Sequence, residues 1–240
     1  MDTMRCGGIS LLGRYHSKNQ DRFYSAMLSD TVGILIVSDG LGSCSWSEIG
    51  AEAFIQAAKE VCNKNSSINT LFQWKECIKK IHEQWLIILS ESNHDIAECQ
   101  CTALLCFVLQ RRLYCARLGD GMIGVLADDR VHVLYDDKAD CFANETHCLH
   151  EAYQEEEWEF YEMPYNHFYG VLSCTDGISI AAGKYEKFTQ DFMLEYANKN
   201  VEQIQTEIED WALRWRSNDD KTVAFLLSDI RGGNGAEKDE

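Results

Sequence analysis

The sequence lacks most of the features that mark secreted, membrane-spanning or nucleic-acid-binding proteins. Among its 240 residues there is one proline, Pro164, and no Gly/Ser-rich stretch that would act as a linker. No apolar run approaches the length that crosses a bilayer. The formal net charge of −17 argues against nucleic acid and anionic membranes as partners, because both bind basic surfaces. We therefore expect one monomeric domain over residues 1–230, followed by a flexible tail over residues 231–240.

The cysteines do not follow a disulfide or zinc-binding pattern. There are 11 of them, an odd number, and no two are spaced as Cys-x-x-Cys. Cys106 and Cys115 lie inside apolar runs, where a free thiol behaves as a small hydrophobic side chain. The first residues lack the apolar segment of a signal peptide. These features predict a cytoplasmic protein whose cysteines are reduced.

Short apolar runs alternate with helical patterns along the chain. Residues 33–37 indicate a buried strand, and Ser45 to Glu48 form a capping box before a helix with apolar residues every four positions. A second helix is predicted over residues 74–88. The remaining elements are a meander of hairpins (102–109, 113–118, 122–126, 131–135), an edge strand or loop (151–162), a strand (168–174), two helices (184–216) and a last strand (221–228). This order favours an α+β fold in which helices cover antiparallel sheets.

Three of the predicted strands end with an aspartate followed by a glycine. The pairs are Asp39-Gly40, Asp120-Gly121 and Asp176-Gly177. Asp-Gly is also typical of tight hairpin turns, and for Asp120 that interpretation has the same weight as a functional one. A carboxylate at the end of a buried strand is held on a rigid scaffold, and the glycine lets the backbone approach a ligand. Such an oxygen-rich environment suits Mg²⁺ or Mn²⁺.

Two further acidic stretches complete an ordered set of six motifs. The set is Gly13…His16…Asn19-Gln20-Asp21; Val37-Ser38-Asp39-Gly40-Leu41-Gly42-Ser43 with Gly50-Ala51; Leu118-Gly119-Asp120-Gly121; Ala143-Asn144-Glu145-Thr146; Ser173-Cys174-Thr175-Asp176-Gly177; and Asp219-Asp220-Lys221-Thr222. In order and spacing it resembles the protein phosphatase 2C family of metal-dependent serine/threonine phosphatases, and most of all a compact bacterial branch of that family. The resemblance extends from residue 7 to residue 227.

The resemblance implies a four-layer αββα sandwich with two divalent cations, Mn²⁺ or Mg²⁺, at one end of its two antiparallel sheets. It places these residues around the ions: Asp21, Asp39, Gly40, Asp120, Asp176 and Asp219. Asp39 would bridge both cations, and the Gly40 carbonyl would join the second. Asp176 and Asp219 would complete the shell of the first cation. Asp21 would orient the second cation or its water, and Asp120 with Asp176 would hold a third, weaker one.

The sequence departs from the family pattern in two places. The family's phosphate-gripping arginine lies five residues before the Asp21 position, where this chain has His16, with Arg14 two residues earlier. His16 could donate to a phosphoryl oxygen or protonate the leaving alkoxide, or it could only cap a turn. On a strand, Arg14 would share a face with His16 and compete for the phosphate. Asp220 stands where many relatives have Asn, and we expect it only to add negative charge.

The function that the resemblance implies is hydrolysis of phosphoserine and phosphothreonine in proteins by a metal-activated water, as part of signalling. The alternative is a pseudo-phosphatase that binds a phosphorylated or regulatory partner without turnover. Retention of Asp21, Asp39, Asp176 and Asp219 favours the enzyme, because a decayed site would be expected to lose ligands. A third possibility, a preference for phosphotyrosine or small phosphorylated metabolites, stays open at this point.

Overall fold

The computed structural model describes residues 4–64, 68–135 and 147–228, which form ten strands and four α-helices. The strands are β1 (Met4–Leu11), β2 (Arg22–Ser29), β3 (Val32–Ser38), β4 (Ala103–Leu109), β5 (Arg112–Leu118), β6 (Met122–Ala127), β7 (Arg130–Tyr135), β8 (Glu159–Pro164), β9 (Phe168–Cys174) and β10 (Lys221–Ser228). The helices are α1 (Ser47–Lys64), α2 (Leu71–Glu91), α3 (Tyr185–Tyr196) and α4 (Val201–Leu213).

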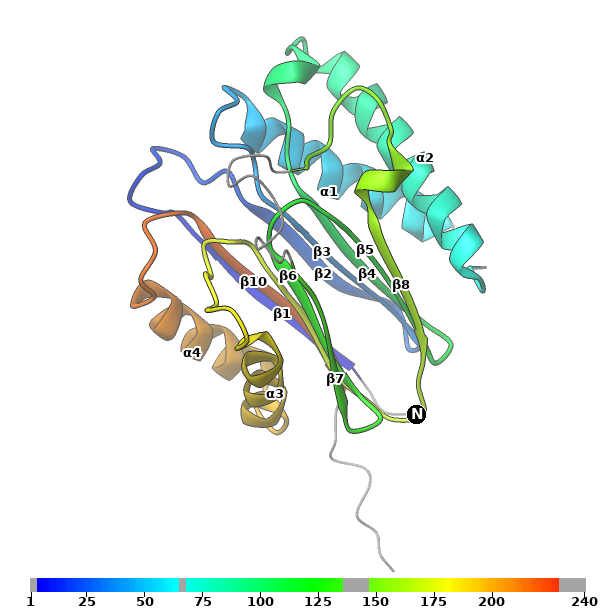
Figure 1. The fold of residues 1–240 in the computed structure, drawn as a ribbon, viewed down its shortest axis with the longest axis vertical. Helices are drawn as coiled ribbons and strands as arrows, with labels where there is room; N and C mark the ends of the chain where they lie inside the picture. Colours follow the sequence, from blue (N-terminus) through cyan, green and yellow to red (C-terminus); the bar gives the residue numbers. More distant parts are fainter. Residues whose placement is uncertain (1–3, 65–67, 136–146, 229–240) are drawn as a thin grey trace, which may run out of the picture.

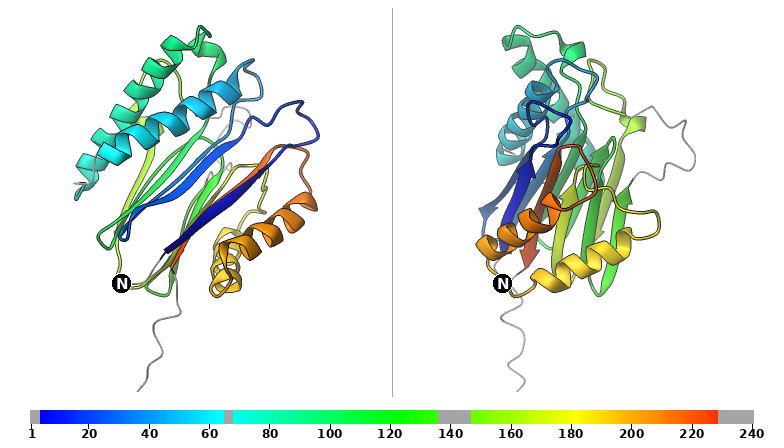
Figure 2. Two further views of the ribbon diagram at one scale, coloured as in Figure 1. Left: turned by 180° about the vertical axis from the view of Figure 1, so that it is seen from behind. Right: turned by 90° about the vertical axis from the view of Figure 1, so that its left-hand side faces the viewer.

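The strands form two antiparallel five-stranded sheets. Sheet A has the order β1-β10-β9-β6-β7, and sheet B has the order β2-β3-β4-β5-β8. Helices α1 and α2 cover the outer face of sheet B, and α3 and α4 cover the outer face of sheet A (Figure 1 and Figure 2). This four-layer αββα arrangement confirms the predicted α+β fold.

Strand β3 lies between two separate hydrophobic cores. Ile34 and Ile36 pack in the core under α1 and α2, while Leu35 and Val37 pack in the core between the two sheets. Successive side chains of a strand point to opposite faces, so a strand buried on both faces needs a continuous aliphatic run. The predicted strand at 33–37 has that run, and the structure extends it to Val32–Ser38.

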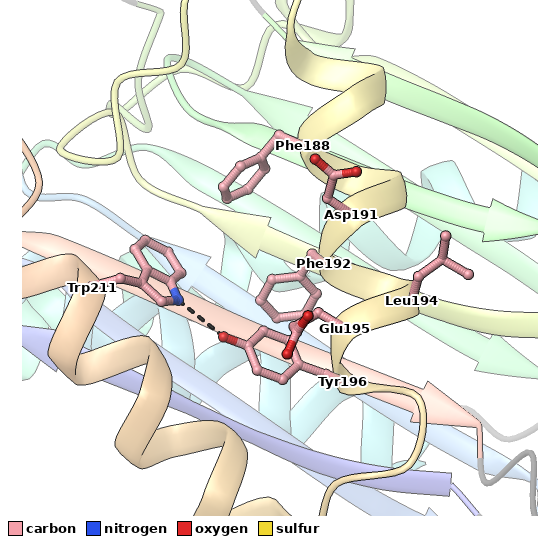
Figure 3. Close-up of a pocket in the computed structure, with 7 residues that line it drawn as sticks. All are labelled: Phe188, Asp191, Phe192, Leu194, Glu195, Tyr196 and Trp211. Carbon is pink, nitrogen blue, oxygen red and sulfur yellow. Dashed lines mark hydrogen bonds between the residues drawn. The ribbon is translucent and has the colours of Figure 1, made fainter.

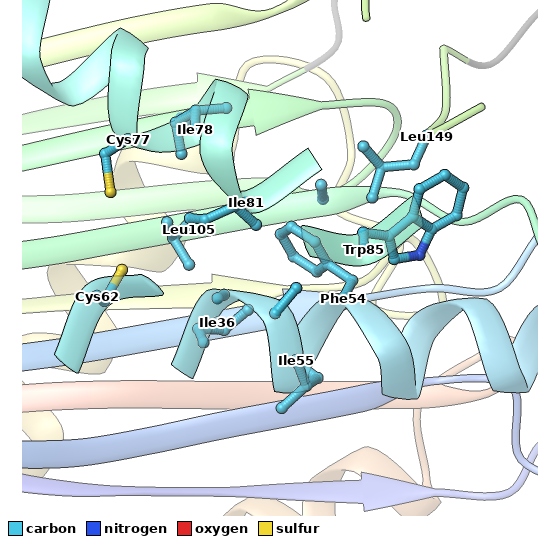
Figure 4. Close-up of a cluster of buried hydrophobic side chains, with 14 of the residues drawn as sticks. Ile36, Phe54, Ile55, Cys62, Cys77, Ile78, Ile81, Trp85, Leu105 and Leu149 are labelled. Atoms are coloured by element: carbon cyan, nitrogen blue, oxygen red, sulfur yellow. The ribbon is translucent and has the colours of Figure 1, made fainter. Parts of the chain in front are cut away.

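Two buried tryptophans of α2 tie this helix to its neighbours. Trp85 Nε1 donates to the Gly50 carbonyl of α1 at 3.0 Å, and Trp74 Nε1 donates to the Cys115 carbonyl of β5 at 2.9 Å. Figure 4 shows Trp85 among the apolar side chains that α1 and α2 bury against sheet B. A Cβ atom on Gly50 would lie 1.7 Å from the Cys99 carbonyl oxygen, so only glycine permits this close approach.

Helices α3 and α4 pack through aromatic side chains over sheet A. Trp211 Nε1 of α4 donates to the Tyr196 hydroxyl of α3 at 3.1 Å (Figure 3). Asn200 caps α4 in a capping box, since its side chain accepts from Gln203 N and the Gln203 side chain accepts from Asn200 N. The hollow of about 600 Å³ in Figure 3 lies against these two helices, and none of the predicted site residues lines it.

The predicted capping box at the start of α1 is wrong. The helix begins at Ser47, two residues after Ser45. The Ser45 N–H donates to Glu98 Oε2 at 2.9 Å, and Glu48 pairs with Lys18 at 3.0 Å instead of reaching back to Ser45. Both groups of the predicted box are therefore bound to partners from distant parts of the chain.

The predicted meander of hairpins is wrong between β5 and β6, because these strands belong to different sheets. Asp120 and Gly121 therefore form a crossover from sheet B to sheet A. Gly119 and Gly121 have φ angles of +88° and +105°, in the left-handed region that favours glycine. The segment 151–162 contains both predicted alternatives, a loop that includes a short 3-10 helix at Glu155–Glu157, and then β8 at the edge of sheet B.

Some predictions fall outside the described residues, namely the motif at 143–146 and the tail at 231–240. Within the described ranges every cysteine is a free thiol. In the same ranges no helix has the length and apolar character needed to span a membrane.

Candidate metal centre

The predicted aspartates lie at strand ends that meet at one end of the sandwich. In sheet B, Arg22 at the start of β2 pairs with Ser38 at the end of β3, which places Asp21 beside Asp39. In sheet A, the end of β9 pairs with the start of β10, which brings the segments of Asp176 and Asp219 together. Antiparallel pairing thus gathers acidic residues that are far apart in the sequence.

A cavity of about 190 Å³, hereafter the carboxylate cavity, brings most of the predicted site residues together. It is lined by His16, Asp39, Gly40, Leu41, Gly42, Thr102, Asp120, Asp176 and Asp219. Asp21 is 1% exposed and lies behind Asp39 instead of on the cavity surface. Arg14 is exposed and does not line the cavity. Six of the eight predicted residues therefore face one small space.

The backbone around Asp39 is fixed by Thr102, which directly precedes β4. Asp39 N donates to Thr102 Oγ1 at 2.9 Å, and Thr102 N donates to the Asp39 carbonyl at 2.8 Å. Ser38 Oγ donates to the Thr102 carbonyl at 2.6 Å. These bonds hold the Asp39 carboxylate on two neighbouring strands, so its position does not depend on a flexible loop.

Asp21 belongs to sheet B, but hydroxyl groups from sheet A hold it. Its Oδ2 accepts from Thr175 Oγ1 at 2.8 Å and from Thr222 Oγ1 at 2.7 Å. Its other oxygen, Oδ1, is buried and has no hydrogen-bond donor. An anionic oxygen buried in this way is costly unless a proton or a cation satisfies it.

Burial and like charge raise the pKa values of the two central carboxyls. Desolvation is the main cause for Asp21, whose pKa rises to about 7 although bonds from Thr222 and Thr175 act in the opposite direction. Desolvation also raises the pKa of Asp39 well above its usual range, followed by the charges of Asp21, Asp176 and Asp219. Without cations, the folded chain therefore holds this cluster against electrostatic repulsion.

The donor set fits divalent cations. Its side-chain ligand atoms are carboxylate oxygens on rigid strand ends, the ligands that hard cations such as Mg²⁺ and Mn²⁺ prefer. Oδ1 of Asp21 is buried without a hydrogen-bond partner, and the raised pKa of Asp39 means that its ionised form is disfavoured unless a cation replaces the proton.

Asp220 has a structural role, so the expectation that it only adds charge is wrong. Its side chain is 2% exposed, and its Oδ1 accepts from Gly13 N at 2.6 Å. Its Oδ2 accepts from Gln20 N at 2.7 Å and lies 2.9 Å from His16 Nδ1. One buried carboxylate thus holds both ends and the middle of the loop over residues 12–20. The only signal of this role in the sequence is that Asp220 directly follows Asp219.

This loop determines which basic side chain faces the carboxylate cavity. Residues 12–20 form a loop and no strand, so Arg14 and His16 do not share the face that they would share on a strand. His16 Nδ1 lies near the carboxylates of Asp220 and of Asp219, at 2.9 and 3.5 Å. These three side chains could also ligate a metal ion, since their ligand atoms lie within 4.8 Å of one another. With Nδ1 engaged, Nε2 is the ring atom of His16 that remains for a substrate.

A cysteine nucleophile does not fit the structure. The Cys-x5-Arg spacing of cysteine-based phosphatases occurs between Cys106 and Arg112. However, Cys106 is fully buried on β4, and burial raises the pKa of its thiol well above the usual range. Arg112 pairs with Glu162 on the neighbouring strand. A thiol of this kind is neither ionised nor reachable by a phosphate ester.

Comparison with known proteins gives a family and a fold. A family model described as protein phosphatase 2C matches residues 14–214. Similar solved structures include the catalytic domain of the serine/threonine phosphatase PstP in complex with two manganese ions, with 17% identity, a TM-score of 0.70, and coverage of 95% of this chain and 99% of that chain. Another is the serine/threonine phosphatase Stp1 from Staphylococcus aureus, with 16% identity, a TM-score of 0.67, and coverage of 97% and 98%.

A third similar structure is the serine/threonine phosphatase of S. agalactiae, with 16% identity, a TM-score of 0.70, and coverage of 93% of this chain and 99% of that chain. At these identities the likeness shows the fold. No curated protein sequence matches the chain significantly.

The metal-free protein should lose stability as the pH rises through the titration of the buried cluster. Asp21 has a pKa of about 7 in the folded chain and an ordinary value of 3.8, so the folded state binds more protons between these pH values. The free energy of unfolding should therefore fall by a few kcal/mol, in order of magnitude, from about pH 4 to pH 7. Urea denaturation in EDTA at pH 5 and pH 8 measures this, and Asp21→Asn should flatten the dependence. If Asp21→Asn keeps the same pH dependence of the free energy of unfolding, the general negative charge of the protein and not Asp21 causes that dependence.

Replacing Asp220 should destabilise the protein, and the loss should grow with the number of hydrogen-bond donors that are left without an acceptor. Asp220→Ala leaves Gly13 N and Gln20 N without a partner inside the protein, and should lower the free energy of unfolding by about 3 kcal/mol or more. Asp220→Asn keeps one acceptor oxygen and should lose less. Thermal and urea denaturation measure both variants. A loss below about 0.5 kcal/mol in Asp220→Ala, the range of surface substitutions, would contradict this role.

Proposed function

Because this chain belongs to the protein phosphatase 2C family, whose model matches most of its length, we propose that it is a metal-dependent phosphatase of phosphoserine and phosphothreonine in proteins. The observation that carries the proposal is the carboxylate cavity, in which aspartates from both sheets face one space. The cysteines of the described ranges are free and mostly buried, which fits a reducing cytoplasm.

We assign the cation ligands to the strand-end carboxylates. Asp39, Asp176 and Asp219, with the Gly40 carbonyl, would hold two Mn²⁺ or Mg²⁺ ions, as the two manganese ions in the PstP structure suggest. Asp21 would orient the second ion or its water from behind, and Asp120 with Asp176 would hold a third, weaker ion. When bound, such ions lower the pKa of a water molecule and offset the charge of the phosphoryl oxygens.

The side chains of the protein itself hold the carboxylates in position and supply a proton donor. Thr102 and Ser38 hold Asp39 on the strand ends, and Thr175 and Thr222 hold Asp21, so the carboxylates need little rearrangement when a substrate binds. His16 is the proposed substrate contact, because it lines the cavity and its Nε2 can donate to a phosphoryl oxygen or to the leaving alkoxide.

The alternative function, a binding module without turnover, is less favoured. A pseudo-enzyme has no need to keep four carboxylates in one cavity at the cost of their mutual repulsion. Phosphotyrosine and small phosphorylated metabolites as substrates are separated from phosphoserine and phosphothreonine by direct assay.

The purified protein should hydrolyse p-nitrophenyl phosphate and a phosphothreonine peptide with Mn²⁺ or Mg²⁺, and lose this activity in EDTA. Asp39→Asn should lower turnover at least ~100-fold while the protein stays folded, because loss of one preorganised charged group costs on the order of 10²–10³ in rate. Initial rates and circular dichroism measure the two effects.

The matched control is Asp30→Asn, the same change at an exposed turn at the far end of β3. It should turn over at the wild-type rate. Full activity in EDTA would refute the metal mechanism, and inactivity with every metal would favour the binding module.

His16 and Arg14 should differ when each is replaced by alanine. His16→Ala should lower kcat/KM for the phosphopeptide about tenfold, equal to a loss of ~1.4 kcal/mol of transition-state stabilisation. His16→Arg should recover much of this, because a guanidinium offers a fixed charge and two donors. Arg14→Ala should have little effect, since Arg14 does not line the cavity. The reverse result would move the phosphate contact to Arg14, and two silent variants would leave phosphate binding to the cations alone.

A further inference from the structure

A second cavity, hereafter the side cavity, adjoins the carboxylate cavity. It has a volume of about 290 Å³ and shares Asp120 and Asp176 with the carboxylate cavity as a common wall. Its other walls come from the start of β6, the loop that follows β9 and the first turn of α3, which Figure 1 shows next to one another in green and yellow. Two cavities of different character thus open on either side of the same two carboxylates.

Away from the two carboxylates, four of the seven residues that line the side cavity are apolar, and Gly121, Thr175 and Ser179 complete the lining. Met122 and Ile178 line it and are otherwise buried, with 2% and 3% exposure. Ile180 and Tyr185 also line it and are half-buried. The Tyr185 ring stacks on Tyr135 of β7 with its centroid at 4.1 Å, which fixes this wall in place.

The loop that carries these residues is connected directly to the candidate metal centre. Ile178 N donates to the Thr175 carbonyl at 3.1 Å, and Thr175 Oγ1 donates to Asp21. Thr222 N donates to Thr175 Oγ1 at 3.0 Å, so the loop is also fixed to β10. The side cavity is therefore held in register with the carboxylate cavity, as a substrate subsite must be.

We propose that the side cavity is a substrate subsite that receives an apolar side chain of the phosphoprotein, one or two residues from the phosphorylated one. The inference rests on the proposed function. An extended chain advances about 3.3 Å per residue, so a neighbour of a phosphothreonine held in the carboxylate cavity reaches no further than an adjoining cavity. The shared wall of Asp120 and Asp176 meets that requirement, and the volume suits a side chain instead of a folded domain.

Charge adds a second component to the specificity. An acidic side chain would enter the side cavity beside Asp120 and Asp176, and the chain as a whole carries a net charge of −17. As long as the weaker third cation is not bound between Asp120 and Asp176, like charges at short distance repel in a site of lowered dielectric constant. The subsite should therefore prefer apolar side chains over small polar ones, and small polar ones over acidic ones.

The test compares phosphothreonine peptides that differ at one position. Peptides with Leu, Ser or Glu at each position from two residues before to two residues after the phosphothreonine are assayed with Mn²⁺, together with p-nitrophenyl phosphate. In the wild-type protein, kcat/KM should be about tenfold higher for Leu than for Ser at one of these positions, and lowest for Glu. The quantity reported is the ratio of Leu to Ser within one protein preparation, which cancels differences in active fraction.

Two variants change the side cavity in opposite ways. Ile180→Ser removes apolar surface and Ile180→Trp fills the space, and both should bring the Leu/Ser ratio close to one. The matched control is Leu194→Ser, the same kind of change at a residue of α3 that is 58% exposed and does not line the side cavity. It should keep the wild-type ratio.

The outcomes separate this inference from the proposed function. A Leu/Ser ratio near one in the wild-type protein, or a high ratio that survives both Ile180 variants, would overturn the subsite while phosphopeptide turnover upheld the phosphatase. If neither p-nitrophenyl phosphate nor any peptide is hydrolysed with Mn²⁺ or Mg²⁺, the proposed function falls, and the subsite falls with it.

Discussion

Repulsion among the carboxylates at one end of the sandwich is the constraint on which the rest of the site depends. In a flexible chain, Asp21, Asp39 and Asp176 would move apart, but here the strand ends fix their backbones. Hydroxyl groups of Thr175 and Thr222 offset part of the charge on Asp21, and raised pKa values show that the rest is not offset. The two sheets and the hydrophobic cores that pack against them supply the rigidity that holds these like charges close together.

The parts of this structure that could be predicted are those that depend on residues close together in the sequence. Buried strands such as β3 need continuous aliphatic runs, and helices such as α2 show their apolar face as a period, so the fold class followed from pattern. The Asp-Gly pairs at strand ends were also local. The crossover at Asp120 was not, because the same dipeptide suits a hairpin within one sheet and a connection between two. Ser45 has the local sequence of a helix cap. Its backbone N–H instead donates to Glu98, which lies far away in the sequence, so local pattern could not indicate this contact.

The two departures from the family pattern, His16 and Asp220, are in direct contact. From the sequence they read as independent, since they lie more than 200 residues apart. In the structure His16 Nδ1 meets Asp220 Oδ2 at 2.9 Å, so the histidine and the second aspartate form one unit beside the carboxylate cavity. An aspartate can accept from the ring and from two backbone amides at once, whereas an asparagine offers one acceptor oxygen. No reading of local pattern could join the two residues, because only the pairing of β1 with β10 brings them together.

The origin of the carboxylates in both sheets has a mechanical consequence. Asp39 and Asp120 follow strands of sheet B, whereas Asp176 and Asp219 adjoin strands of sheet A. Apart from a few cross-sheet hydrogen bonds, such as Ser25 Oγ to the Phe225 carbonyl and Tyr161 to His132, the interface between the sheets is made of apolar side chains. Apolar contacts resist separation but oppose lateral sliding only weakly. Any ion that Asp39 and Asp176 share would link the two sheets at one end. Loading the ions would then stiffen the sandwich against shear, and the enzyme would be most rigid when it is ready for turnover.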